Sequence, residues 1–275
     1  MKKFWCVSLV LLLTALCAGA RSLTPQVVPE ILEPRGALLA SADPIFINGN
    51  GGFTGYPGNG TKADPYRIVN LTINGNATAW CIAVQSTDCY FIINGCTLSN
   101  ATAGVLLINV TFATVNGSVI TNTATGIDFK SVENSTIVNS TIRHTINGGI
   151  LTFLCHNNTI TANTVEDNPR HGIQVEGSDE NEISGNTLRR NGIALVLWTS
   201  HNNTVSRNTF QCNDEAWQLQ SSTGNTFHDN VLLECETPPI PGFGWVACLI
   251  AGAALVAGGF LRARAKKAEF AAPRR

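Results

Sequence analysis

The chain has 275 residues, of which only 13% are charged, and its formal net charge is −1 at neutral pH. Proteins that bind nucleic acid carry a basic patch or stripe, and this sequence has none, so we expect no nucleic acid partner. Abundant Asn and Thr at such low charge is also not the composition of a disordered chain.

The N-terminal 74 residues divide into three predicted segments. Residues 1–20 are predicted to be a signal peptide, because two lysines precede a short apolar stretch and Ala18-Gly19-Ala20 forms a small-x-small cleavage site. Residues 21–42 contain three prolines and no periodicity, which indicates a spacer. Residues 43–74 contain strand-like runs joined by a Gly-rich segment, and we expect them to form an N-terminal cap and the first strands.

Residues 75–235 contain a repeat. Apolar residues five positions apart recur with successive spacings of 22, 22, 23, 23, 22 and 22 residues, and a fixed period in this range is typical of a solenoid. The pairs are Ile93/Leu98, Val115/Ile120, Ile137/Ile142, Ile160/Val165, Ile183/Leu188, Val205/Phe210 and Phe227/Leu232. A second apolar block, usually opened by Gly, precedes each pair: Gly104-Val105-Leu106, Gly126-Ile127-Asp128, Gly149-Ile150-Leu151, Gly172-Ile173-Gln174, Gly192-Ile193-Ala194 and Ala216-Trp217-Gln218.

These units favour an all-β fold. β-Branched residues and Asn dominate every unit, and no helical periodicity is present, so we predict a single-stranded, right-handed parallel β-helix of about eight coils with 22–23 residues each. Each strand would then pair with its equivalent one coil away, at about 4.8 Å. A polar column three residues after each first apolar residue predicts a structural ladder of hydrogen-bonded amides, formed by Asn163, Asn186, Asn208 and Asn230.

The C-terminal residues predict a membrane anchor. Residues 236–241 contain three prolines and form a predicted stalk, and an uncharged apolar stretch follows. Residues 242–261 are predicted to be a transmembrane helix and residues 262–275 a basic cytoplasmic tail. The positive-inside tendency places the repeats outside the cell, at its surface.

Export permits disulfides and glycans. Six cysteines lie outside the targeting segments, and Cys212 and Cys235 are favoured as a disulfide because adjacent coils bring them together. Ten Asn-x-Ser/Thr sequences are potential glycosylation sites, although the repeat itself enforces many of them. They begin at Asn59, Asn70, Asn76, Asn100, Asn109, Asn116, Asn134, Asn139, Asn157 and Asn202.

The sequence resembles a known family in several segments. Residues 43–50, 58–61 and 64–68 look like the opening of archaeal surface proteins with right-handed β-helix repeats, which are related to the copper-binding protein NosD. Residues 90–96 and 201–205 resemble the coils of these proteins. Pro241-Gly242-Phe243, followed by the apolar and basic residues, resembles a sorting signal read by archaeosortases. That resemblance implies that the tail is cut and replaced by a lipid.

The Gly-opened strands predict a surface for partners. We expect two columns of outward side chains on these strands. The column two positions after the opening residue consists of Leu106, Asp128, Leu151, Gln174, Ala194 and Gln218. The column four positions after it consists of Ile108, Lys130, Phe153, Glu176, Val196 and Gln220. Asp128, Phe153, Glu176 and Trp198 are our candidates for contact with sugar or protein. Asp128 and Glu176 would lie two coils apart, roughly 10 Å, which is a poor arrangement for acid–base catalysis.

A second column suggests metal binding. Four residues before the first apolar residue of successive pairs stand Glu133, His156, Asp179 and His201. Imidazole and carboxylate groups on adjacent coils could share copper or another divalent metal. The alternative is a hydrogen-bonded turn ladder without metal.

Together these features predict an exported, membrane-anchored, non-catalytic module that binds surface glycans or proteins. The first alternative is a NosD-like accessory protein that binds copper, and no cofactor is otherwise expected. The second alternative is a carbohydrate-active enzyme, namely a polysaccharide lyase, hydrolase or epimerase, because related β-helices include such enzymes.

Overall fold

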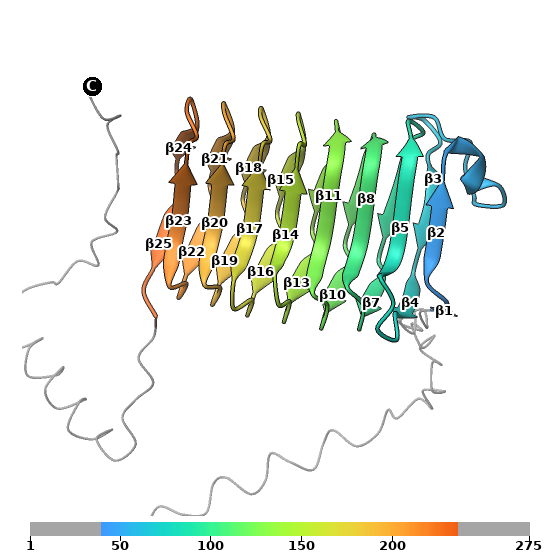
Figure 1. Ribbon diagram of the computed structural model, residues 1–275, viewed down its shortest axis with the longest axis horizontal. Helices are drawn as coiled ribbons and strands as arrows, with labels where there is room; N and C mark the ends of the chain where they lie inside the picture. The colour runs from blue at the N-terminus through green and yellow to red at the C-terminus, as the bar shows by residue number, and fades with distance from the viewer. Residues whose placement is uncertain (1–39, 236–275) are drawn as a thin grey trace, which may run out of the picture. The chain divides into compact units, whose positions relative to one another are not determined.

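The computed structural model describes residues 40–235, which wind into an all-β solenoid of parallel strands (Figure 1). The predicted signal peptide, most of the spacer, the stalk, the transmembrane segment and the basic tail lie outside these residues. Within residues 40–235, no helix has the length and apolarity needed to cross a membrane.

Three parallel sheets form the walls of the solenoid, and each coil contributes one strand to each sheet. Sheet A consists of β1 (Ala40–Ala42), β4 (Leu71–Asn74), β7 (Thr97–Ser99), β10 (Val119–Thr121), β13 (Thr141–Arg143), β16 (Thr164–Glu166), β19 (Thr187–Arg189), β22 (Thr209–Gln211) and β25 (Val231–Leu233). Sheet B consists of β2 (Ile45–Asn48), β5 (Trp80–Thr87), β8 (Ala103–Thr111), β11 (Thr125–Glu133), β14 (Gly148–Phe153), β17 (His171–Glu176), β20 (Ile193–Trp198) and β23 (Glu215–Gln220). Sheet C consists of β3 (Tyr66–Val69), β6 (Phe91–Asn94), β9 (Ala113–Asn116), β12 (Thr136–Val138), β15 (Thr159–Thr161), β18 (Glu182–Ser184), β21 (Thr204–Ser206) and β24 (Thr226–His228).

The repeated apolar pairs line the interior of the solenoid, as predicted. In sheet C, Ile137 pairs with Val115 on one side and with Ile160 on the other, and the same register continues along the sheet. In sheet A, Ile120 pairs with Leu98 and Ile142. Like residues therefore stack over like residues, and nearly all of them are fully buried. This stacked column of aliphatic side chains is the hydrophobic core.

The first coil differs from the prediction in two respects. Residues 40–42, which we assigned to the spacer, form β1 and pair with β4. The predicted cap is already part of the solenoid, because β2, β3 and β4 each join one of the three sheets. A 3-10 helix, η1 (Asn50–Phe53), lies between β2 and β3 and places the buried Phe53 ring in a stack on Tyr66. The solenoid has about seven turns rather than the eight that we predicted.

Polar ladders follow the corners of the coil. The Asn186 side chain accepts a hydrogen bond from the backbone N–H of Asn163 at 2.9 Å, and its amide nitrogen donates to Asn208 at 3.0 Å. The structure contains two Asn columns in addition to the one we predicted. The three are Asn158, Asn181, Asn203 and Asn225; Asn163, Asn186, Asn208 and Asn230; and Asn168, Asn191 and Asn213.

Ser and Cys extend these columns toward the N-terminus. Ser140 continues the Asn163 column, and its hydroxyl group accepts the backbone N–H of Ser118 at 3.2 Å. A fourth column, in the same turn between sheets B and C as the Asn181 column, consists of Ser178 and Ser200, preceded by the buried Cys155. Every corner of the coil therefore has a side chain that pairs with buried backbone groups, which would otherwise destabilise the fold by ~1–3 kcal/mol each.

Candidate functional site

The outward side chains of sheet B form two columns in the structure. Register pairs Lys130 with Phe153, Phe153 with Glu176, Glu176 with Trp198, and Trp198 with Gln220. Within a column, neighbouring residues lie one coil apart, at about 4.8 Å. The second column consists of Leu106, Asp128, Leu151, Gln174, Val196 and Gln218.

This register corrects one predicted alignment. We expected Gly192 to lie opposite Gly172 on the neighbouring coil. In the structure, Gln174 pairs with Val196 and Glu176 pairs with Trp198. The residue opposite Gly172 is therefore Ala194, two positions later in the chain than predicted. The physical reason is burial in the interior of the solenoid. Leu195 and Leu197 are both fully buried there, and this burial sets the register of β20, whereas the position of a single Gly beside an apolar run does not set it.

Two exposed aromatic rings dominate the first column. Phe153 is 44% exposed and Trp198 is 42% exposed, so both rings offer apolar surface to a partner. Glu176 lies between them, one coil from each, so the two aromatic residues are about 10 Å apart. We call Phe153, Glu176 and Trp198 the aromatic platform.

The carboxylates of this face already have partners on their own strands. Asp128 forms an ion pair with Lys130 at 3.0 Å, and Gln174 donates a hydrogen bond to Glu176 at 3.1 Å. The two carboxylates belong to different columns and lie two coils apart. They therefore do not share a reacting atom, as a general acid and a general base must.

His171 lies on the same face, at the start of β17. It is paired with Gly148 on one side and Ile193 on the other. Burial lowers the pKa of His171 and the neighbouring Arg170 lowers it further, against a smaller opposing effect of a hydrogen bond with Gln174. The imidazole is therefore neutral at neutral pH, and its buried Nδ1 atom has no hydrogen-bond partner within residues 40–235.

The predicted metal column forms hydrogen bonds to the backbone. The Nδ1 atom of His156 accepts the N–H of Asp179 at 3.1 Å, and an Asp179 carboxylate oxygen accepts the N–H of His201 at 2.6 Å. The Nδ1 atom of His201 in turn accepts the N–H of Thr223 at 3.1 Å. Glu133 is joined to His156 by a β-bridge. Among the residues described, no three His, Cys, Asp or Glu side chains gather in a way that could hold a metal.

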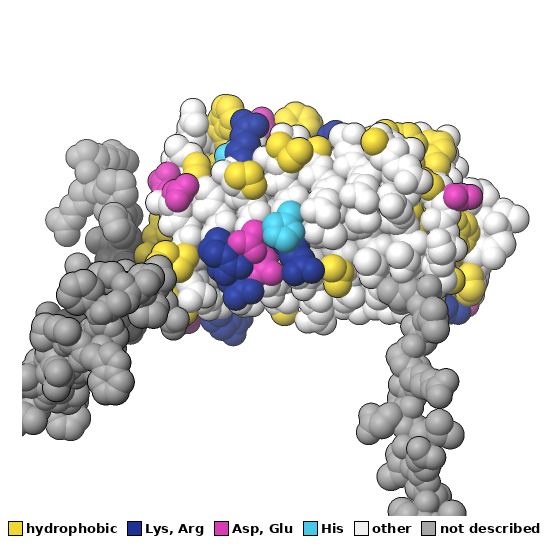
Figure 2. All heavy atoms as spheres, turned by 90° about the horizontal axis from the view of Figure 1, so that it is seen from below, with side chains coloured by type: hydrophobic (Ala, Val, Ile, Leu, Met, Phe, Trp, Pro, Cys, Tyr) yellow, Lys and Arg dark blue, Asp and Glu magenta, His cyan; other side chains and the backbone are white. Residues whose placement is uncertain are grey.

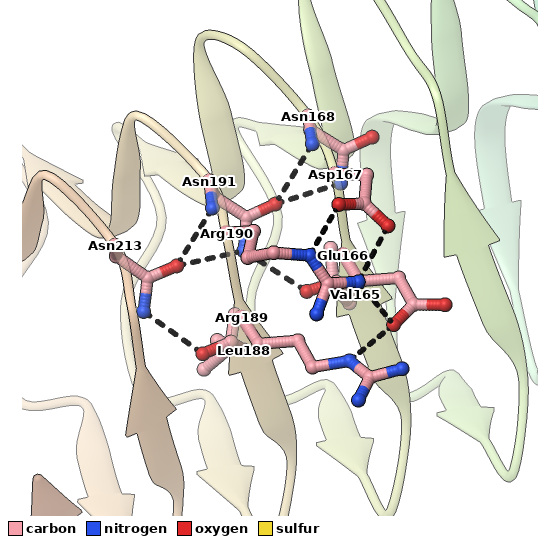
Figure 3. A network of polar contacts seen from close by, with 9 residues as sticks. All are labelled: Val165, Glu166, Asp167, Asn168, Leu188, Arg189, Arg190, Asn191 and Asn213. Atoms are coloured by element: carbon pink, nitrogen blue, oxygen red, sulfur yellow. Dashed lines mark hydrogen bonds and ion pairs between the residues drawn. The ribbon is translucent and has the colours of Figure 1, made fainter. Parts of the chain in front are cut away.

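Charged side chains gather at one corner of sheet A (Figure 2). Glu166 is only 6% exposed, and it forms ion pairs with Arg189 and Arg190 from the next coil. Two guanidinium nitrogens of Arg190 donate to the two oxygens of Asp167, at 2.6 and 2.7 Å. These bonds lower the pKa of Asp167. The Asn168 column lies beside them (Figure 3). Because a buried carboxylate needs a charged partner, we interpret this cluster as a clamp between coils.

Cys212 and Cys235 form a disulfide across adjacent coils, with their Cα atoms 4.9 Å apart. This is the pair that the sequence favoured. Cys155 is a buried free thiol, and burial raises its pKa to about 11. It is therefore protonated and unreactive at neutral pH.

Comparison with solved structures supports the fold alone. Two variants of the periplasmic alginate epimerase AlgG are 14% and 15% identical to this chain, with TM-scores of 0.56 and 0.57. The matches cover 61% and 62% of this chain but only 45% of each epimerase chain, so the chain spans less than half of their length. Tailspike protein 2 of bacteriophage CBA120 is 9% identical with a TM-score of 0.50, over 72% of this chain and 38% of the tailspike chain.

Comparison with sequence families is more specific. No curated protein gives a significant match. A family model described as periplasmic copper-binding protein (NosD) matches residues 64–237, which is more than half of the chain and includes all the regular coils. This chain therefore belongs to the NosD family of parallel β-helix proteins.

Proposed function

We propose that this protein is an extracytoplasmic, membrane-anchored module that binds polysaccharide on sheet B without cleaving it. The observation that carries the proposal is the aromatic platform, in which Phe153 and Trp198 flank Glu176 on successive coils. A sugar ring packs its apolar C–H face on an exposed aromatic ring, while its hydroxyl groups seek hydrogen-bond partners. Gln174 and Gln220, beside the two rings, supply such partners.

The repeat of the solenoid suits a polymeric ligand. Side chains recur along a column every ~4.8 Å, so a chain of sugars lying parallel to the solenoid axis meets a new rung at regular intervals. Gln218 and Gln220 extend the platform toward the last coil. A linear polysaccharide can therefore use several weak contacts at once, and their effects multiply.

The partners of the carboxylates support binding rather than catalysis. Asp128 is held by Lys130, and Glu176 is held by Gln174. The similarity to an alginate epimerase leaves sugar chemistry open as an alternative, because that protein acts on a polysaccharide and shares this fold. A product assay separates the two functions.

We do not propose a copper-dependent role, although the family description names copper. The Nδ1 atoms of His156 and His201 accept backbone N–H groups, which leaves only the Nε2 atom of each ring for a metal. Within residues 40–235 no three His, Cys, Asp or Glu side chains gather around one point, so the residues described do not fit the copper site that the family description implies. Copper titration of the protein and of a His156→Ala/His201→Ala double variant tests the earlier prediction, and we expect no difference between them.

The location of the protein is also a proposal. The family description and the signal-peptide pattern support an extracytoplasmic location, and the apolar stretch 242–261 would anchor the chain in the membrane. If the resemblance of residues 241–243 to an archaeosortase signal is functional, the mature protein lacks the basic tail. Intact-mass measurement of the protein extracted from membranes distinguishes a retained tail from a cleaved, lipid-linked end.

The binding proposal is tested first on a glycan array and then by titration of the strongest polysaccharide. Trp198→Ala and Phe153→Ala should each weaken binding at least tenfold, or about 1.4 kcal/mol, because buried aromatic contacts dominate such interfaces. The matched control is Phe46→Ala, which removes another exposed ring of sheet B outside the platform. Equal loss in all three variants contradicts the proposal, and the release of shortened or altered sugar chains would identify an enzyme instead.

A further inference from the structure

A hollow of about 430 Å³ lies on sheet C, beside the turn that joins it to sheet B. Its floor includes outward residues of three successive strands, Ile92 of β6, Thr114 of β9 and Thr136 of β12. The segment between β2 and β3 contributes Lys62 and Pro65. The hollow shares no residue with the aromatic platform or with the column from Glu133 to His201.

One wall of the hollow is a pair of stacked aromatic rings. Tyr90 and Phe112 lie one coil apart, with their centroids 4.3 Å apart and an angle of 6° between the rings. Both side chains are partly exposed. Stacking of this kind stabilises the pair by about 0.5–1.5 kcal/mol, and it presents a broad apolar surface at the rim of the hollow.

Phe112 has an unusual backbone for an aromatic residue. Its φ is 60°, in the left-handed region that favours Gly and Asn. At the same corner of later coils stand Asn134, Asn157, Glu180, Asn202 and Gly224, all with positive φ. A bulky ring at this corner costs roughly 1–2 kcal/mol relative to Gly. Residues with positive φ recur at the corners of the coils, Leu154 and Thr199 among them, so the conformation belongs to the coil, and what is specific to position 112 is the stacked ring that it carries.

The charge of the hollow is positive. Lys62 is the one charged side chain that lines it, and no carboxylate does so. Among residues 40–235, Lys62 takes part in no ion pair. Two threonine hydroxyl groups and the amide of Asn134 complete the lining with neutral hydrogen-bonding groups.

We propose that this hollow binds a single pyranose ring that carries a carboxylate. The apolar face of the sugar packs on the Tyr90–Phe112 pair, and its carboxylate pairs with the Lys62 ammonium group. Thr114 and Thr136 bind its hydroxyl groups. The site is separate from the aromatic platform, so it does not depend on the function proposed for sheet B.

The test measures binding to the full-length protein by saturation-transfer NMR, with methyl β-D-glucuronide and methyl β-D-glucoside as probes. The two differ in the group on C6, and we expect the glucuronide to bind at least tenfold more tightly. Lys62→Gln should remove this difference. The charge-matched control is Arg207→Gln, at an exposed cation outside the hollow, and it should leave the difference unchanged.

Phe112→Gly tests the aromatic wall. Gly occupies the equivalent corner at position 224, so this variant should fold, and circular dichroism checks that it does. Asn is avoided because Asn-Ala-Thr would create a glycosylation sequence. We expect at least tenfold weaker binding of the glucuronide.

Two results would overturn the proposal. One is equal affinity of the native protein for both probes, including no measurable binding of either. The other is full retention of glucuronide binding by Lys62→Gln and Phe112→Gly. The Trp198→Ala variant keeps the two proposals distinguishable: it should retain glucuronide binding, and loss in that variant alone would place the ligand on sheet B.

Discussion

The central Asn column predicts a measurable difference between two substitutions at Asn186. Its side chain is 1% exposed. Its oxygen accepts the backbone N–H and the side-chain amide of Asn163, at 2.9 and 3.0 Å. Its nitrogen donates to the carbonyl of Ile160 at 2.8 Å and to Asn208 at 3.0 Å.

Asn186→Ala removes all four bonds at once. The amide of Asn163 still donates to the carbonyl of Ile137, but the buried N–H of Asn163 loses its acceptor. An orphaned buried N–H costs ~1–3 kcal/mol, and the two bonds that Asn186 donates contribute about 1 kcal/mol each. We therefore expect the free energy of unfolding to fall by roughly 3–5 kcal/mol, a large part of the 5–15 kcal/mol typical of a domain.

Asn186→Ser should cost much less. Ser occupies the same column at Ser118 and Ser140, where its hydroxyl group accepts the backbone N–H of the preceding coil. The backbone N–H of Asn163 therefore keeps an acceptor, and its side-chain amide keeps the carbonyl of Ile137. The main loss is the two bonds that Asn186 donates, for a cost of about 2 kcal/mol.

Urea unfolding midpoints of the two variants measure this difference. Glu182→Ala, an exposed residue on the outside of sheet C, is the control and should stay within about 0.5 kcal/mol of the native protein. If Ala and Ser at position 186 lower the midpoint equally, the orphaned N–H is not the cause and the reasoning is refuted.

Three further predictions concern the cysteines and the charged corner. Cys212→Ser should lower the free energy of unfolding by about 3 kcal/mol in the chain-entropy model, because the disulfide links residues 23 apart. An unchanged urea midpoint in non-reducing buffer would contradict this. The hydrogen bonds from Arg190 lower the pKa of Asp167 below its ordinary value of 3.8. The contribution of this pair to stability is therefore present above that pH and is lost as the pH falls through the folded pKa. Asp167→Asn should therefore flatten the pH dependence of Tm below pH 3.8, and an unaltered slope would show that the pair is not responsible. Burial raises the pKa of Cys155 to about 11, so iodoacetamide at pH 8 should leave it unlabelled in the folded protein and label it after unfolding, as read by peptide mass mapping.

Much of the architecture was predictable because each repeat of the sequence forms one coil of the solenoid. When strands pair with their equivalents one coil away, residues separated by one period must stack. That relation placed Ile137 over Ile160 and Cys212 beside Cys235 from sequence alone. Two contacts that we did not predict obey the same relation. The ring stack of Tyr90 and Phe112 joins residues 22 positions apart, and so does the hydrogen bond between Asn181 and Asn203.

The candidate site was predicted less completely than the core. Phe153, Glu176 and Trp198 were all candidates, but Val196 was expected in the place that Trp198 occupies. The opening Gly of each block was an unreliable marker in β20, where six apolar residues follow one another and strand alternation is not visible. A shift of two residues keeps the same face outward, so hydrophobic pattern alone could not detect it.

The sequence by itself determined the period, the parallel pairing and the identity of the stacked columns, because these depend only on spacing along the chain. The tertiary structure alone decided which outward side chains are exposed, which carboxylates are already paired, and where an irregular segment borders a sheet to make a hollow. Those properties depend on distances between atoms from different coils and from the segment between β2 and β3. No periodic pattern records how Lys62, from an irregular segment, meets Tyr90 and Phe112 on the regular coils.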